Sequence, residues 1–215
     1  EGPKLLVEAH ADEIGFVVKS INSDGYINIA PKNRNMGRPG RDRFLIGQPA
    51  LIQTGKRNVE GTIATVSGHV MPPKLKEKDV LNWEDIFVDI GVRDQKEAED
   101  MGISIGDVVI WNPNTRRVGN LVTGKAMDDR AGLAIMTKLL EKISPAEIEF
   151  DLYFASTTQE EMGLVGAGSL EREMKYDLAV ALDVGLAGDI PGVGKEECPA
   201  SLGSGPTVVH HDGRV

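Results

Sequence analysis

The hydrophobic pattern of the chain changes twice, and these changes limit the folds available to it. Residues Lys4 to Ala9 form a short apolar run that stops at a polar cluster, as a buried strand does at its end. From Phe16 to Val122 the apolar residues come in short alternating runs punctuated by Gly, Asn and Pro. After Gly124 longer elements alternate between helix and strand patterns. The chain is therefore predicted to fold as two differently built parts.

The alternating middle region is typical of a small β-barrel or β-sandwich. Its clearest strand-like runs are Gly25–Ala30, Gln48–Thr54, Val59–Val66 and Gly106–Trp111. One short helix is predicted from Arg93 to Met101, ending at Gly102. Trp83 and Trp111 also lie in this region, and we expect them in its core or in an interface between subunits.

The region after Gly124 has the alternating helix and strand patterns of an α/β domain. Apolar residues at spacings of three and four predict an amphipathic helix from Arg130 to Ile143. Two further strands and the end of a helix are predicted at Ile148–Thr157, Asp177–Val184 and Ser169–Lys175. This alternation favours an α/β fold. We predict one α/β domain built from residues 1–15 and 120–215, interrupted by a β-rich insert of residues 16–119.

Composition excludes several classes of protein. Of the 215 residues, 24 are basic and 33 acidic, and the net charge of −9 disfavours a nucleic-acid partner, which needs clustered Lys and Arg. The single cysteine excludes a disulfide framework and a thiolate zinc site, and it favours a reducing, cytoplasmic location. No apolar run approaches the roughly 20 residues of a membrane span, so no membrane partner is predicted.

Polar clusters follow the predicted strands or begin the next helix, where α/β proteins carry their active sites. They are Ala9–Gly15, Gly124–Gly132, Thr158–Ala167 and Leu182–Gly185. Each supplies a carboxylate, and the first also supplies His10. Converging carboxylates repel one another unless a cation compensates. Imidazole and carboxylate ligands without thiolate favour zinc, cobalt or manganese, and this number of ligands favours two ions that share a bridging carboxylate.

Each cluster also has an ordinary structural explanation. A lone His10 is more often a buried histidine with its hydrogen bonds satisfied than a metal ligand. The acidic pairs Asp128–Asp129 and Glu160–Glu161 are common at solvated helix starts, and Asp183 can cap a turn. The occurrence of all the clusters together, with the acidic pairs following strands among glycines, favours the metal site over these explanations.

The motifs AHADEIG, GKAMDDRAG, TTQEEMGLVGA and ALDVG, in this order and with a β-rich insert after the first, resemble a known family. It is the glutamyl/tetrahedral aminopeptidase family of dinuclear metallopeptidases, whose members are often labelled endoglucanases or cellulases. The resemblance implies a mixed-sheet catalytic domain with flanking helices and a β-rich domain that mediates dimerisation. It also implies assembly of dimers into a hollow dodecamer.

The resemblance implies a set of metal ligands for two divalent ions per subunit, with Zn or Co favoured and Mn as the alternative. His10 and Asp183 would bind one ion and Glu161 the other. Asp128 would bridge the two ions, and Asp129 would be a structural neighbour of that bridge rather than a ligand. A last histidine ligand would lie in a segment after residue 215.

Two further residues have catalytic roles in the family pattern. Glu160 would be the general base, and Asp12 would be the acid that orients His10. The chemistry requires the same division, because a ligating imidazole is oriented by a partner on its other nitrogen and a base must stay free of the metals. His210 and His211 fall short of the expected last ligand, so we expect them not to bind metal.

The predicted function is hydrolysis of the N-terminal residue of peptides, through a metal-bridging water that Glu160 activates. Peptides and further copies of the chain are the predicted partners. The alternatives are a related dinuclear deacylase or carboxypeptidase, a glycosidase that uses two carboxylates without metal, and a non-catalytic assembly module with an incomplete metal site. The arginine-rich run from Arg34 to Arg43 is expected to be a solvated loop, with an oligomer contact or a charged chamber rim as the alternatives.

Overall fold

The computed structural model of the chain describes residues 2–32 and 44–209. The predictions for Arg34–Arg43 and for His210 and His211 fall outside these residues. The chain divides into two compact units. The first comprises Glu1–Ala11, Asp128–Ser156 and Lys175–Val215, and the second comprises Asp12–Met127 and Thr157–Met174.

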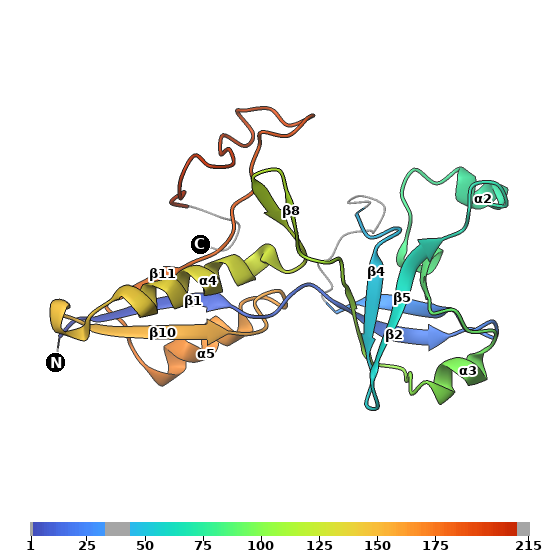
Figure 1. Cartoon of the computed structure of the whole chain (residues 1–215), viewed down its shortest axis with the longest axis horizontal. Helices are drawn as coiled ribbons and strands as arrows, with labels where there is room; N and C mark the ends of the chain where they lie inside the picture. The colour runs from blue at the N-terminus through green and yellow to red at the C-terminus, as the bar shows by residue number, and fades with distance from the viewer. Residues whose placement is uncertain (1, 33–43, 210–215) are drawn as a thin grey trace. The chain divides into compact units, whose positions relative to one another are not determined.

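The first unit is built on a sheet in the order β10-β1-β11. Its strands are β1 (Lys4–His10), β10 (Asp151–Thr157) and β11 (Leu178–Ala181). Strands β1 and β11 are parallel, with Leu6 opposite Ala179. Helix α4 (Met127–Lys142) and the short η2 (Pro145–Glu147) precede β10 in the chain, and Figure 1 shows α4 running along the strands. Because parallel strands end at the same edge of a sheet, β1 and β11 bring their following residues together.

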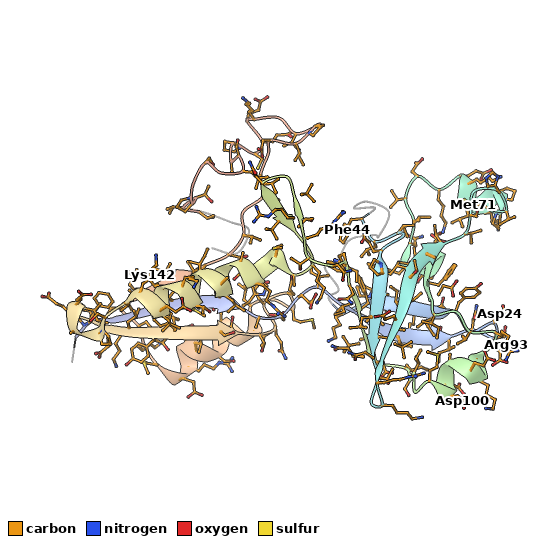
Figure 2. All side chains as sticks on the ribbon, in the orientation of Figure 1. Asp24, Phe44, Met71, Arg93, Asp100 and Lys142 are labelled. Carbon is orange, nitrogen blue, oxygen red and sulfur yellow. The ribbon has the colours of Figure 1, made fainter. Side chains whose placement is uncertain are left out.

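Helix α4 packs on this sheet through part of the apolar set that predicts it, whereas Ile135 and Leu140 of the same set are exposed. Met136 is buried with Val7 and Ala9 of β1, and Leu133 packs against the same cluster. Asp128 and Asp129, near the beginning of α4, have non-helical backbone angles. The regular helix therefore begins at Arg130, as predicted. The helix ends at Lys142 (Figure 2), whose positive charge suits the C-terminal end of the helix dipole.

The second unit contains a closed barrel with the strand order β2-β3-β6-β5-β4-β7. The strands are β2 (Phe16–Ile21), β3 (Ile27–Pro31), β4 (Pro49–Gln53), β5 (Asn58–Thr65), β6 (Ile86–Asp89) and β7 (Val108–Trp111). Alternate residues point inward, so that Phe16, Ile27, Ile63 and Val88 are fully buried. Pairing of β2 with β7 closes the barrel and leaves it without an open edge. The predicted α/β fold with a small β-rich part is confirmed, and the β-rich part is a barrel.

Both tryptophans pack at the edge of the barrel core, as predicted. The ring of Phe16 lies 5.3 Å from the ring of Trp83 and 6.0 Å from that of Trp111, measured between centroids. Phe44, labelled in Figure 2, makes an edge-on contact with Trp111 at 5.3 Å. Through these aromatic contacts the two tryptophans pack against the barrel core.

The remaining elements of the second unit are short. They are α2 (Pro73–Lys76), η1 (Trp83–Asp85), α3 (Gln95–Asp100), the hairpin of β8 (Arg116–Val118) with β9 (Leu121–Thr123), and α5 (Val165–Glu173). Helix α3 begins later than the predicted Arg93 because the Asp94 side chain accepts a hydrogen bond from the Glu97 amide and caps the helix. None of the helices in the described ranges is long and apolar enough to cross a bilayer.

Candidate metal centre

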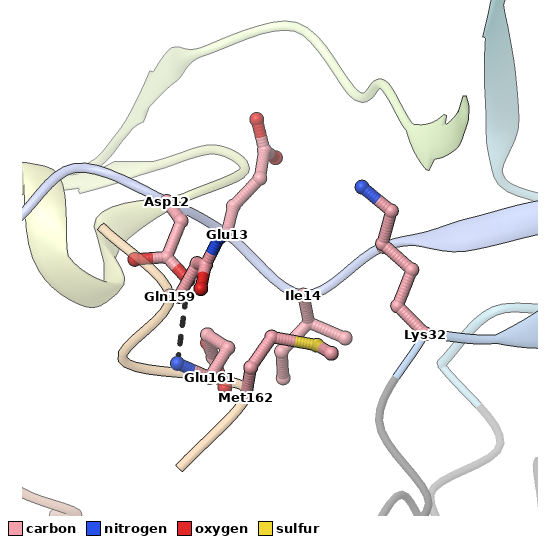
Figure 3. A pocket seen from close by; sticks show the side chains of 8 residues that line it. Asp12, Glu13, Ile14, Lys32, Gln159, Glu161 and Met162 are labelled. Atoms are coloured by element: carbon pink, nitrogen blue, oxygen red, sulfur yellow. Dashed lines mark hydrogen bonds between the residues drawn. The ribbon is translucent and has the colours of Figure 1, made fainter. Parts of the chain in front are cut away.

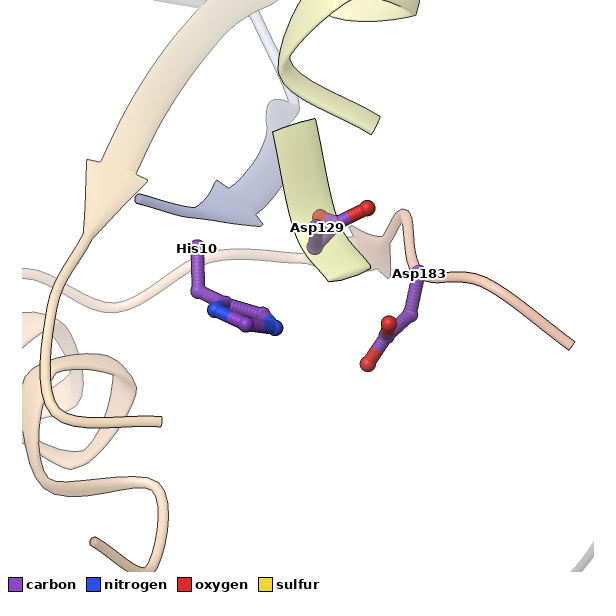
Figure 4. Close-up of side chains that lie close together, drawn as sticks. All are labelled: His10, Asp129 and Asp183. Atoms are coloured by element: carbon purple, nitrogen blue, oxygen red, sulfur yellow. The ribbon is translucent and has the colours of Figure 1, made fainter. Parts of the chain in front are cut away.

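Three predicted cluster residues converge in the first unit. His10, Asp129 and Asp183 each offer one ligand atom, and these atoms lie within 4.8 Å of one another. Figure 4 shows the three side chains facing a common space. His10 is the last residue of β1, and Asp183 follows the end of β11, where the Leu182 amide continues the pairing by donating to the Glu8 carbonyl at 2.8 Å. The parallel pairing of β1 with β11 therefore explains why these residues meet.

Asp129 is fully buried, which is costly for a carboxylate. Its Oδ1 accepts a hydrogen bond from the Gly132 amide at 2.9 Å, whereas Oδ2 is buried and receives no hydrogen bond of ordinary geometry from the described residues. Burial raises the pKa of Asp129 and the nearby Asp183 carboxylate raises it further, whereas the backbone amides of Gly132 and His10 oppose this rise. A divalent cation bound to Oδ2 would compensate the buried charge, so this environment fits a metal ligand.

Asp128 also contacts His10 in the same unit. His10 Nε2 and Asp128 Oδ1 are 2.8 Å apart, with the histidine side chain 3% exposed and that of Asp128 51% exposed. The Nε of Arg130 donates to the carbonyl oxygen of Ala11 at 3.1 Å, which ties the start of α4 to the end of β1. The structure thus brings His10 next to both acids of the Asp128–Asp129 pair.

The other predicted residues meet in the second unit. The Asp12 carboxylate accepts hydrogen bonds from the amides of Glu160 at 3.1 Å and Glu161 at 3.3 Å, and Figure 3 shows Asp12 facing the turn that carries Glu161. This turn follows β10 and is tightly wound, because the Glu160 carbonyl accepts from the amides of Gly163 at 2.7 Å and Leu164 at 2.9 Å. Asp12 therefore fixes the backbone from which both glutamates project.

A cavity of about 270 Å³ lies beside this turn within the second unit. Its lining residues are Asp12, Glu13, Ile14, Gly15, Lys32, Gln159, Glu161 and Met162 (Figure 3). Glu161 contributes to the wall of the cavity, whereas Glu160 does not. The wall combines the apolar side chains of Ile14 and Met162 with charged side chains, among them Glu161 and Lys32.

The structure groups the sequence-predicted residues into two sets. His10, Asp128 and Asp183 lie together in the first unit, and Asp12, Glu160 and Glu161 lie together in the second. Asp129, expected only as a neighbour of the bridge, belongs to the first set. The sequence signal for its position is Gly132, since a Cβ there would lie 2.5 Å from the Asp129 carboxylate oxygens.

Comparison with known proteins gives a consistent picture. The family described as M42 glutamyl aminopeptidase matches residues 1–215. The chain is 31% identical over 219 residues to the glutamyl aminopeptidase of Lactococcus lactis subsp. cremoris (strain MG1363), a match that covers 98% of this chain and 58% of that protein.

Solved structures agree with this match. The aminopeptidase APDkam598 from the archaeon Desulfurococcus kamchatkensis superposes with a TM-score of 0.84 and 33% identity over 95% of this chain and 54% of that one. The TET1 peptidase of Pyrococcus horikoshii, which can assemble into a tetrahedron or a large octahedral shell, gives a TM-score of 0.73 and 26% identity over 88% of this chain and 57% of that one. The chain thus spans little more than half the length of these relatives. By its motifs, its fold and the match along its whole length, the chain belongs to the M42 glutamyl aminopeptidase family.

Proposed function

We propose that the protein is a metal-dependent aminopeptidase that removes the N-terminal residue of peptides. The observation that carries this proposal is the convergence of His10, Asp129 and Asp183, whose ligand atoms lie within 4.8 Å of one another. A buried, desolvated carboxylate next to an imidazole and a second carboxylate is a donor set for a divalent cation. Membership of a family named for its aminopeptidase activity supports the reaction class.

The proposed centre holds two divalent ions, Zn or Co, with Mn as the alternative. His10 and Asp183 would hold one ion, Glu161 the other, and Asp128 would lie between them as the shared ligand. The burial of Asp129 beside His10 and Asp183 makes it a further candidate for the first ion. Bound ions of this kind polarise a carbonyl group and lower the pKa of water.

Glu160 is the proposed general base. It would take the proton from the attacking water and return it to the nitrogen of the leaving peptide, which makes that nitrogen a good leaving group. The proposed role of Asp12 is to orient the reacting groups, through His10 as the family pattern implies. Its bonds to the Glu160 and Glu161 amides support a second route to the same end, because they fix the backbone that carries the base.

The proposed domain division assigns residues 1–15 and 120–215 to the catalytic part and residues 16–119 to dimerisation. The barrel runs from Phe16 to Trp111 and lies inside this insert. We propose that copies of the chain assemble into dimers and then into a dodecamer, consistent with the tetrahedral assembly described for the TET1 peptidase of Pyrococcus horikoshii. A cytoplasmic location is proposed from the single cysteine.

A panel of three peptides with one sequence tests the proposal, one with free termini, one N-acetylated and one C-amidated. The aminopeptidase should cleave the free and the amidated peptides but not the acetylated one. A chelator should abolish cleavage, and added Zn²⁺ or Co²⁺ should restore it. Cleavage that requires a free carboxyl terminus would instead identify a carboxypeptidase. Metal-dependent melting without any hydrolysis would identify a non-catalytic module, and cleavage of glycosides that survives the chelator would identify a glycosidase.

A further inference from the structure

An ion pair in the second unit joins the chain segment that follows His10 to the segment that precedes Asp128. The Nζ of Lys125 lies 2.7 Å from Oε1 of Glu13, across 112 residues of sequence. Glu13 is three residues beyond His10, and Lys125 is three residues before Asp128. Each partner therefore sits one short segment away from a residue that is proposed to bind metal.

Both partners are partly buried, which separates this pair from an ordinary surface ion pair. The side chains of Lys125 and Glu13 are 26% and 15% exposed. By comparison, the side chains of Lys138 and Glu141, paired on the surface of α4, are 71% and 57% exposed. Exposed pairs contribute little to stability, whereas removing one partner of a buried pair leaves an uncompensated charge.

Lys125 is the partner that compensates the charge of Glu13. The other carboxylate oxygen, Oε2, is buried and accepts no hydrogen bond from any described residue. The position of the Glu13 carboxylate is therefore set chiefly by the Lys125 ammonium group. Glu13 also lines the cavity next to Asp12, so a shift of this segment would move the cavity wall as well.

The segment that carries Lys125 is conformationally constrained on both sides of it. Ala126 has a φ of 52°, a left-handed conformation that is costly for a residue with a Cβ and that persists only where surrounding contacts impose it. Gly124 packs so closely on the chain at Thr115 that a Cβ would lie 2.6 Å from the Thr115 Oγ1. The ion pair is one of the side-chain contacts that link this strained segment to the one that follows His10.

We propose that Glu13 and Lys125 form a positioning pair that sets the spacing between the segment ending in His10 and the segment leading to Asp128. On this basis the pair determines how well the metal centre is preorganised. The bond from Arg130 to the Ala11 carbonyl braces the same two segments beyond the ligands. The inference rests on the proposed function, because it requires His10 and Asp128 to act as metal ligands.

The test uses the variants Lys125→Met, Glu13→Gln, the double variant of both, and Lys125→Arg. Zinc affinity is measured by calorimetric titration of metal-free protein, and the unfolding temperature is measured on the same metal-free samples. Lys125→Met should weaken zinc binding about tenfold, the low end of what changes around metal ligands cost. It should also lower kcat more than it changes KM. Lys125→Arg keeps the charge and should bind zinc nearly as the wild type does.

The double variant separates positioning from stability. Removal of both charges leaves no uncompensated group, so the unfolding temperature should recover toward the wild-type value. Zinc affinity should stay weakened, because the two segments are no longer tied together. Lys138→Met, which breaks an exposed pair on α4, is the matched control and should change neither quantity.

Either of two results would overturn the positioning role: wild-type zinc affinity in Lys125→Met, or zinc affinity and unfolding temperature that recover together in the double variant. These results leave the proposed function untouched when the wild type still cleaves peptides. If the wild type binds zinc but cleaves no peptide, the proposed aminopeptidase function is wrong. The zinc affinities of the variants then still decide whether Glu13 and Lys125 position the ligands. A wild type that binds no divalent metal contradicts both proposals.

Discussion

The imidazole Nε2 of His10 lies 2.8 Å from Oδ1 of Asp128, across 118 residues of sequence. The contact joins the carboxyl end of β1 to the start of α4, and it places two proposed metal ligands at hydrogen-bond distance. A cation that entered between them would replace this hydrogen bond with two ligand bonds. The pair is therefore the simplest place to test whether the cluster binds metal.

Asp128→Ala should remove metal from the purified protein, because it deletes the ligand proposed to be shared by both ions. The metal content per subunit, measured by elemental analysis after extensive dialysis, should fall from two ions toward none. Asp24→Ala changes an exposed aspartate in the second unit and should leave the metal content unchanged. Full metal content in Asp128→Ala would exclude the bridging role.

Gly132→Ala should weaken metal binding through Asp129. A Cβ at position 132 would lie 2.5 Å from the Asp129 carboxylate oxygens, so this carboxylate must move. Gly168→Ala is the matched control, since Gly168 is also helical and a Cβ there meets no atom within 4 Å. It should stabilise α5 by up to about 1 kcal/mol. Equal zinc affinity in the two variants, measured by calorimetry, would show that the Asp129 carboxylate does not contribute to the centre.

Asp85 should make barrel stability depend on acid pH. Burial acts to raise the pKa of Asp85, but hydrogen bonds from Lys78 and from the Asn82 amide outweigh it and lower this pKa below 3.8. A lowered pKa stabilises the fold above the unfolded-state value, and this contribution is lost as the pH falls through the folded-state value. The unfolding temperature of Asp85→Asn should therefore lie below that of the wild type at pH 7. The difference between the two should shrink below about pH 4. A difference that stays constant down to about pH 2.5 would contradict this assignment.

Ile63→Ala should destabilise the barrel strongly, because Ile63 is fully buried in its core. Truncation of a buried isoleucine to alanine costs about 2–5 kcal/mol. Ile105→Ala removes the same atoms from a residue that is 74% exposed and should change the unfolding free energy by no more than about 0.5 kcal/mol. Chemical denaturation monitored by tryptophan fluorescence measures both values, because Trp83 and Trp111 pack against this core. A cost for Ile63→Ala close to that of the control would contradict the burial of Ile63 in the barrel core.

The local sequence pattern predicts the individual strands and helices well, but it does not predict that the strands close into a barrel. The alternating run Val59–Val66 becomes β5 and the apolar spacing from Arg130 becomes the regular part of α4, because local periodicity determines which face is buried. The barrel, in contrast, is closed by the pairing of Phe16 with Val109, a contact between residues far apart in the sequence. Nothing in the local pattern distinguishes this closure from a sandwich.

The site shows the same limit at the scale of single residues. The sequence places His10 at the end of β1 and Asp183 after β11, and parallel pairing of these strands brings the two residues together. Which acid of the Asp128–Asp129 pair is buried depends on the non-helical backbone angles at the start of α4. The contact of Asp12 with the Glu160 and Glu161 amides likewise depends on the wound turn after β10. Both are set by tertiary packing, which the order of residues alone does not specify.

The most direct test of the central claim is the kcat of Glu160→Gln for an aminoacyl-anilide, with metal content measured on the same sample. Glutamine keeps the size of the side chain and leaves the backbone amide of residue 160 free to donate to Asp12, but its side chain cannot take a proton from water. We predict a loss of about a hundredfold to ten-thousandfold in kcat, the usual contribution of a general base, with the full metal content retained. Wild-type turnover in this variant, at full metal content, would contradict the account.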